Sequence, residues 1–279
     1  MTSDLRDRPG YDQRFLANEI AAPDLALVLN DVPAVDGDPV LRYAHFSLAM
    51  SASRRLAYWA AWNIDGGRLL GDDAPGRESQ RFRPDPRLPA GLQTLNDVYR
   101  DNRLDRGHLA RRADLLWGTP VEAEQANDDS FYFTNIAPQM DNFNQSRAYG
   151  LWGRLENAVL DRVDVDGGRL TVQAGPVLGI DDPPYRSVRV PVQYWKLVAY
   201  EVRGELRCRA FLMAQQIALE ANRDPLDAFA VYRVALRQLA DKTQLGYAAR
   251  LLDAERAGDV APLETDQPQL IRSPDDVPW

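Results

Sequence analysis

Short apolar runs rich in β-branched and aromatic residues most constrain the fold of this chain. Runs of this length and composition are typical of strands buried in a sheet. They lie at residues 41–50, 56–64, 130–136, 170–178, 190–200 and 206–214. The first two runs are expected to pair as a hairpin, and Asp65-Gly66-Gly67 forms a turn after the second. Pro138 is expected to end the strand over 130–136.

Two other segments carry apolar residues three and four positions apart, which predicts helices. They are residues 150–163 and 225–254. The stretch over 72–89 is rich in Asp, Pro, Gly and Arg and lacks periodicity, so it is expected to be a surface loop. Strands and helices in this order predict one α+β domain with a mixed or antiparallel sheet.

The domain is expected to span residues 41–254. Residues 1–40 mix Pro, Asp and short apolar pieces, so we expect an extended arm that lies over the core. Residues 255–279 form an acidic, Pro-rich tail without a periodic pattern, expected to be mobile.

Composition excludes several classes of protein. The 279 residues are 45% hydrophobic, enough to fill a core, but no apolar run approaches the roughly 20 residues of a membrane helix. No signal peptide is visible at the start, so we expect a soluble, cytoplasmic protein with no membrane partner. One cysteine, Cys208, excludes an internal disulfide and a cysteine-based zinc cage. It is expected to be buried and unreactive.

The charge of the chain is unevenly distributed. The net charge of −8 argues by itself against a polyanionic partner. Residues 77–112, however, hold nine arginines against five acids, whereas six acids and two arginines lie in 255–279. Only two of the 33 basic residues are lysines, and the arginine fork matches phosphate oxygens. A genome with biased base composition explains this arginine excess equally well.

A histidine between arginines, followed by amide-rich segments, points to phosphate chemistry. The segments are residues 104–112, 135–139 and 142–145. Phosphodiester hydrolysis needs a base for water, a cation on the phosphate oxygens and positive charge for the transition state. A neutral imidazole can supply the base near physiological pH. Mg²⁺ prefers oxygen ligands and keeps several waters, which suits Asn144 and Glu156.

Each of these signals is weak when taken singly. A lone histidine in a globular chain is more often structural, and Asn-Gln pairs before a helix are common caps. His45, within an apolar strand pattern, is expected to be structural. The combined order of Asp-Arg-Gly-His, Thr-Asn-Ile-Ala-Pro-Gln, Phe-Asn-Gln and Trp-Gly-Arg-Leu-Glu is much harder to obtain by chance.

The ordered motifs resemble those of the DNA/RNA non-specific endonucleases, the ββα-metal nuclease family. The matching segments are residues 105–108, 133–139, 143–145 and 152–156, and weaker likeness extends over roughly residues 10–215. The resemblance implies a ββα-metal nuclease core on a mixed or antiparallel sheet flanked by helices. It also implies Mg²⁺-dependent hydrolysis of DNA and of RNA, with Mn²⁺ able to replace Mg²⁺.

Roles for single residues follow from the same resemblance. His108 is the expected general base, and Asn144 is the expected direct metal ligand. Glu156 is expected to hold metal-bound water from the following helix. Asn135 is expected beside them, and Arg106 near the scissile phosphate. Further phosphate contacts are expected from Arg103, Arg111 and Arg112.

Two departures from the family pattern stand out. The interval from Asn144 to Glu156 spans twelve residues, longer than in several relatives. One secreted member of the family has an arginine that is thought to stabilise the transition state. This chain has Asn63 at the matching position, so the role is expected to pass to Arg106 or a neighbouring arginine.

These departures keep a second hypothesis open, a weakened nucleic-acid- or partner-binding module of the same fold. A zinc-type HNH nuclease is disfavoured because only His108 lies near the site. A homodimer is expected by analogy. A nuclease inside its own cell also requires restraint, by an inhibitor, an activating partner, proteolysis or the chain's termini, as in a defence or toxin effector.

Overall fold

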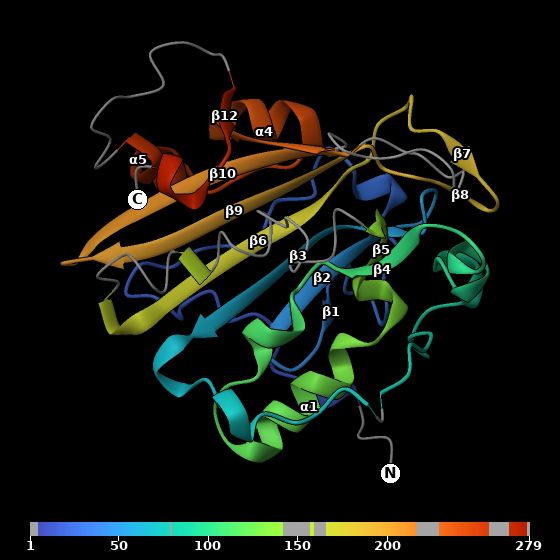
Figure 1. The fold of residues 1–279 in the computed structure, drawn as a ribbon, viewed down its shortest axis with the longest axis horizontal. Helices are drawn as coiled ribbons and strands as arrows, with labels where there is room; N and C mark the ends of the chain where they lie inside the picture. The colour runs from blue at the N-terminus through green and yellow to red at the C-terminus, as the bar shows by residue number, and fades with distance from the viewer. Residues whose placement is uncertain are drawn as a thin grey trace.

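A computed structural model describes residues 5–78, 80–141, 157–158, 166–215, 229–256 and 268–277. Its largest element is an eight-stranded sheet in which every neighbouring pair is antiparallel (Figure 1). In sheet order the strands are β1 (Leu41–Arg42), β2 (Phe46–Ser51), β3 (Leu56–Asp65), β6 (Arg169–Val177), β9 (Gln193–Val202), β10 (Glu205–Gln215), β11 (Phe229–Val234) and β12 (Gln269–Ile271).

Both faces of this sheet are buried, which explains why its strands are apolar almost throughout rather than alternating. Along β9, Trp195 and Leu197 pack into one hydrophobic cluster, whereas Tyr194 and Val198 pack into another on the opposite side. Helices α4 (Leu236–Thr243) and α5 (Ala249–Arg256) cover the first side, here called the rear face.

The opposite side, here called the site face, carries a second, two-stranded sheet. It consists of β4 (Leu104–His108) and β5 (Ile136–Met140), which pair antiparallel (Figure 1). Helix α1 (Pro120–Ser130) lies between them in the chain. A small hairpin of β7 (Pro184–Tyr185) and β8 (Val188–Arg189) projects at one end of the molecule.

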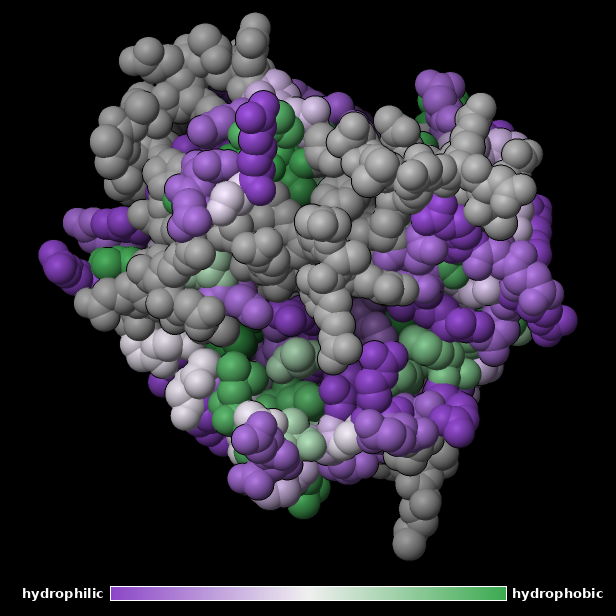
Figure 2. Space-filling model, viewed as in Figure 1, coloured by the Kyte–Doolittle hydropathy of each residue, from purple (hydrophilic) through white to green (hydrophobic). Residues whose placement is uncertain are grey.

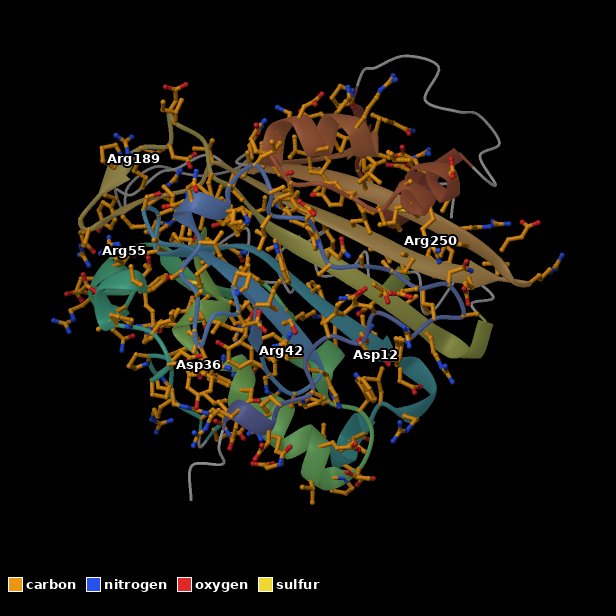
Figure 3. All side chains as sticks on the ribbon, turned by 180° about the vertical axis from the view of Figure 1, so that it is seen from behind. Asp12, Asp36, Arg42, Arg55, Arg189 and Arg250 are labelled. Atoms are coloured by element: carbon orange, nitrogen blue, oxygen red, sulfur yellow. The ribbon has the colours of Figure 1, made fainter. Side chains whose placement is uncertain are left out.

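The N-terminal segment begins beside α1 and then crosses the rear face, where Figure 3 labels Asp12. Four of its apolar side chains are buried in the rear-face cluster: Tyr11, Leu16, Ile20 and Leu25. The carboxylate of Glu201 accepts hydrogen bonds from the backbone of Ala17 and Asn18 at 3.1 and 2.8 Å. The segment therefore covers apolar surface that the sheet would otherwise expose to water.

Most predicted strands are confirmed. The first two form the expected hairpin, β2 and β3, with Gly66–Arg68 as a 3₁₀ turn after it. The first strand is interrupted before Phe46, because His45 has a left-handed backbone (φ 69°). Strands β6, β9 and β10 correspond to the three later runs.

The prediction of a strand over 130–136 that ends at Pro138 is wrong. Helix α1 reaches Ser130, a 3₁₀ turn follows at Phe133–Asn135, and Pro138 lies within β5. The carbonyl of Pro138 points away from β4 and accepts a 2.7 Å hydrogen bond from the Tyr194 hydroxyl. Because the ring nitrogen of Pro138 needs no partner in β4, the proline is compatible with the strand.

The prediction of one helix over 225–254 is also wrong in its first part. Residues Phe229–Val234 form β11, which pairs with β10, and the helices α4 and α5 follow. The tail also differs from expectation, since Gln269–Ile271 adds β12 to the sheet and Ile271 and Val277 are buried. Of the helix expected over 150–163, only residues 157–158 are described, and both are helical.

Within the described ranges, no helix is both long and apolar enough to span a membrane.

Candidate active site

His108 is the last residue of β4, and the pairing with β5 determines where its side chain lies. The backbone amide of Leu109 continues the pairing with a 2.9 Å hydrogen bond to the Asn135 carbonyl. Gly107, just before the histidine, lies beneath the buried side chain of Gln139. A Cβ atom on Gly107 would come within 2.6 Å of the Gln139 Cγ atom. Glycine is therefore required by close packing within the Asp-Arg-Gly-His segment.

Asn135 holds the turn that follows His108. Its buried side chain accepts a 2.9 Å hydrogen bond from the Ala110 amide and donates one of 3.0 Å to the Ala110 carbonyl. It also donates to the Ser130 carbonyl at 3.2 Å. All three hydrogen bonds join the side-chain amide of Asn135 to backbone atoms. Asn135 therefore positions the residues after His108.

Aromatic rings surround the imidazole of His108. The ring centroid of Phe131 lies 5.3 Å away in an edge-to-face arrangement, and that of Phe82 lies 5.7 Å away. Burial, and then the positive charges of Arg77 and Arg112, lower the pKa of His108 from 6.5 to about 3. The ring is therefore neutral at physiological pH. Its buried Nε2 atom has no hydrogen-bond partner in the described structure.

Arg77 is the residue near His108 that the motifs did not identify. It lies in the loop predicted over 72–89, its side chain is exposed, and it makes no ion pair with the described residues. The available signal was its place as the first arginine of the arginine-rich segment 77–112. Its distance from His108 in the sequence concealed their proximity.

The predicted phosphate-binding arginines fall into two groups. Arg103 binds the carboxylate of Asp141 through two hydrogen bonds, at 2.8 and 3.1 Å. Arg111 pairs with Asp114 at 3.3 Å. In these two cases a neighbouring carboxylate offsets the charge, which makes phosphate binding less favourable.

Arg106 and Arg112 have neutral partners instead. Arg106 donates to the Asn96 side chain at 2.9 Å, and its guanidinium lies 5.4 Å from the Phe82 ring centroid. Arg112 donates to the Asn127 side chain at 2.6 Å and to the Pro75 carbonyl. Their charges are not offset by an ion pair within the described residues, and Arg112 acts electrostatically on His108.

The expected metal ligands, Asn144 and Glu156, lie outside the described residues. Among those that are described, no group of three or more His, Cys, Asp or Glu could hold a metal ion. Cys208 is buried, and burial raises the pKa of its thiol. His45 stacks on Trp117 and contacts the Leu115 carbonyl at 2.8 Å, in agreement with a structural role. The described side chains therefore do not assemble a zinc site.

Asn63 does not take the place of an arginine beside His108. Its side chain accepts a 2.8 Å hydrogen bond from the Asp12 amide and donates to the Asp12 carbonyl at 3.2 Å. Its neighbours in β3, Trp62 and Ile64, pack on the site face, so Asn63 points toward the N-terminal segment on the rear face. Asn63 therefore takes no part in the surroundings of His108, where the positive charge of Arg77 acts on the imidazole.

The contact between Gly107 and Gln139 predicts the effect of a substitution. Gly107→Ala should lower the free energy of unfolding by about 1–3 kcal/mol, because the added methyl group overlaps the buried Gln139 side chain. Urea denaturation measures this change. Gly107→Ala should cost much less in a Gln139→Ala background than in the unsubstituted chain, and an equal cost in both backgrounds would contradict the steric explanation.

The electrostatics predict an unusual titration of His108. Its ring should stay neutral from pH 7 down to about pH 5, because burial and nearby cations disfavour the imidazolium. Arg112→Met should raise this pKa toward 6.5, whereas Arg81→Ala, at an exposed arginine, should leave it unchanged. NMR titration of the histidine Cε1–H signals tests this. A pKa near 6.5 in the unsubstituted chain would contradict it.

Comparison with known proteins gives consistent results. The family model for DNA/RNA non-specific endonucleases matches residues 26–254. An uncharacterised protein of Sinorhizobium fredii, y4fB, is 34% identical over 270 residues, 89% of this chain and 40% of that protein. Human mitochondrial endonuclease G is 29% identical over 67% of this chain and 62% of its own length. The chain thus spans less than two thirds of these two relatives.

A solved structure supports the fold independently. The crystal structure of the EndoG/EndoGI complex matches with a TM-score of 0.59 at 20% identity, covering 79% of this chain and 89% of that one. The chain has the α+β fold of the ββα-metal nucleases and belongs to the DNA/RNA non-specific endonuclease family.

Proposed function

We propose that the chain is a Mg²⁺-dependent endonuclease that hydrolyses phosphodiester bonds in DNA and RNA with little sequence preference. The observation that carries the proposal is a neutral His108 beside arginines that make no ion pair with the described residues, and its Nε2 atom has no hydrogen-bond partner among these residues. A neutral imidazole can accept a proton from water, and guanidinium groups nearby favour the charge that develops on phosphate. Membership of the nuclease family supports the same activity.

Each group has a distinct role in the proposed mechanism. His108 takes the proton of the attacking water, and the rings of Phe82 and Phe131 hold the imidazole in place. Arg77 and Arg112 stabilise negative charge on the phosphate. Arg106 contacts the sugar-phosphate backbone of the nucleic acid next to the reacting phosphate.

The metal requirement rests on residues of the expected helix and the segment before it. Asn144 would bind Mg²⁺ directly and Glu156 would bind it through water, and Mn²⁺ would substitute. The oxygen donors of these two residues fit a hard cation. The Nε2 atom of His108, which has no hydrogen-bond partner among the described residues, can act as the base. The ion would supply positive charge on the phosphate oxygens.

The substrate class follows from the chemistry of attack. Water as the nucleophile makes no use of the ribose 2′-hydroxyl, so the mechanism allows both DNA and RNA. Contacts to phosphate carry no sequence information and weaken as salt rises. Hydrophilic side chains gather at the end of the molecule near β7 and β8 in the view of Figure 2, as expected of a surface in contact with water.

The first prediction concerns the general base. His108→Ala should abolish nicking of plasmid DNA and cleavage of RNA in Mg²⁺, and EDTA should abolish both in the unsubstituted chain. Agarose gels and a fluorescent RNA substrate measure the two activities. Full activity of the variant would refute the mechanism. If the unsubstituted chain binds nucleic acid but cleaves none with any of several divalent metals, the alternative of a nucleic-acid-binding module would be favoured.

The second prediction concerns the arginine beside the histidine. Arg77→Ala should lower kcat about 100-fold, because it removes a cation that stabilises the transition state. Arg81→Ala is the matched control, since this exposed arginine donates to the backbone carbonyls of Glu78 and Gln80. Steady-state rates on plasmid give the comparison. Equal rates for the two variants would remove Arg77 from the proposed mechanism.

Restraint of the activity is also part of the proposal. A companion inhibitor is the best supported form, because the structural relative was solved as an EndoG/EndoGI complex described as showing EndoG inhibition. An activating partner, proteolysis or the chain's own termini are the alternatives, within a role in defence or toxicity. A homodimer and a cytoplasmic location complete the proposal, and sedimentation equilibrium and cell fractionation test them.

Control by the tail makes a separate prediction. If the tail restrains the enzyme, the intact chain should be harmless when expressed, and a chain trimmed before Glu255 should be toxic. Because Ile271 and Val277 are buried, circular dichroism must first show that the trimmed chain folds. Equal toxicity of two folded chains would exclude restraint by the tail.

A further inference from the structure

We propose that Arg8 is a positioning residue for His108, so that the N-terminal segment is part of the machinery of the site. Arg8 lies before residue 26, where the match to the family begins. The inference rests on the proposed function, because it assigns a catalytic consequence to a buried ion pair. The pair itself, and its connection to His108, can be tested without measuring cleavage.

The ion pair joins the N-terminal segment to the end of α1. The guanidinium of Arg8 donates from Nε to Asp129 Oδ2 at 2.6 Å and from Nη2 to Oδ1 at 3.3 Å. The two side chains are only 5% and 1% exposed. Asp129 also accepts a 2.9 Å hydrogen bond from the Ala44 amide. One buried carboxylate thus connects the N-terminal segment, the β1–β2 connection and α1.

The two residues that follow Asp129 connect it to His108 through direct contacts. The Ser130 carbonyl accepts a hydrogen bond from the Asn135 side chain, and the same side chain binds the amide and carbonyl of Ala110. Phe131, two residues after Asp129, packs edge-on against the imidazole. A shift of the α1 terminus would therefore reach His108 through the ring of Phe131 and through the Asn135 amide.

Burial makes this connection sensitive to the loss of one partner. A carboxylate that is nearly inaccessible to water and has lost its cation is strongly unfavourable. Without Arg8, Asp129 would have to move toward solvent or bind a proton, and either change disturbs its bidentate contact. Reacting groups displaced by about 1 Å can lose two orders of magnitude in rate. Arg8 itself is too buried to touch the substrate.

The first experiment compares two arginines of the N-terminal segment. Arg8→Ala should lower kcat on plasmid about tenfold or more and leave KM within about twofold. The control Arg14→Ala should change neither, because Arg14 is 82% exposed and forms a 3.5 Å surface pair with Glu19. A folded Arg8→Ala variant with unchanged kcat would overturn the inference, as would a raised KM with kcat unaffected.

A second variant covers the case in which Arg8→Ala does not fold. Arg8→Met/Asp129→Asn removes both charges of the pair, and the asparagine oxygen can still accept a hydrogen bond from the Ala44 amide. We expect it to fold and to keep the lowered kcat, because the bidentate contact is absent. Activity equal to that of the unsubstituted chain would show that the pair serves stability alone and would overturn the inference.

A third measurement is independent of cleavage. The chain has two histidines, His45 and His108, so their Cε1–H NMR signals can be assigned with one substitution. The His108 signal should move in the Arg8 variant and stay unchanged in Arg14→Ala. If the unsubstituted chain cleaves nothing, the proposed function fails, yet a moved signal still supports the connection. An unmoved signal overturns the inference whatever the activity.

Discussion

Burial of both faces of one large antiparallel sheet is the constraint on which the rest of the structure depends. The strands β3, β6, β9 and β10 are apolar on both sides, so neither face can be left to water. Helices α4 and α5, together with the N-terminal segment, cover the rear face, and the β4–β5 pair docks on the site face. The Tyr194 hydroxyl, which reaches from β9 to the Pro138 carbonyl, ties this pair to the sheet.

The position of His108 is a consequence of that docking. Pairing with β5 brings Asn135 to the turn after the histidine, and the edge of α1 brings Phe131 against its ring. Burial then keeps the imidazole neutral even though the segment around it is rich in cations. The cations that suit a phosphate also keep the imidazole unprotonated in the free protein, and the negative charge of a bound phosphate would offset their effect on its pKa.

Several features were predictable because their signals are local. Strands β2, β3, β6, β9 and β10 follow from runs of apolar residues, and the order of motifs identified His108. Helix α1 was not predicted because its buried side chains include Asn127 and Asp129, which leave no apolar stripe. The strand β11 has a helix-compatible spacing, and pairing with β10 decided its conformation. Neither Asn144 nor Glu156 is placed by the described residues, so their roles remain predictions.

Sequence by itself determined the class of the protein: an α+β domain, a single histidine in an Asp-Arg-Gly-His segment, and arginine as the dominant cation. Tertiary structure decided which arginines form ion pairs among the described residues. Arg103 and Arg111 are paired with acids, whereas Arg77 approaches His108 from a distant loop. The tertiary structure also joins Arg8 to the site through Asp129. The physical reason is that charge interactions depend on distance and burial, and segments far apart in the chain acquire both only when the sheet is packed.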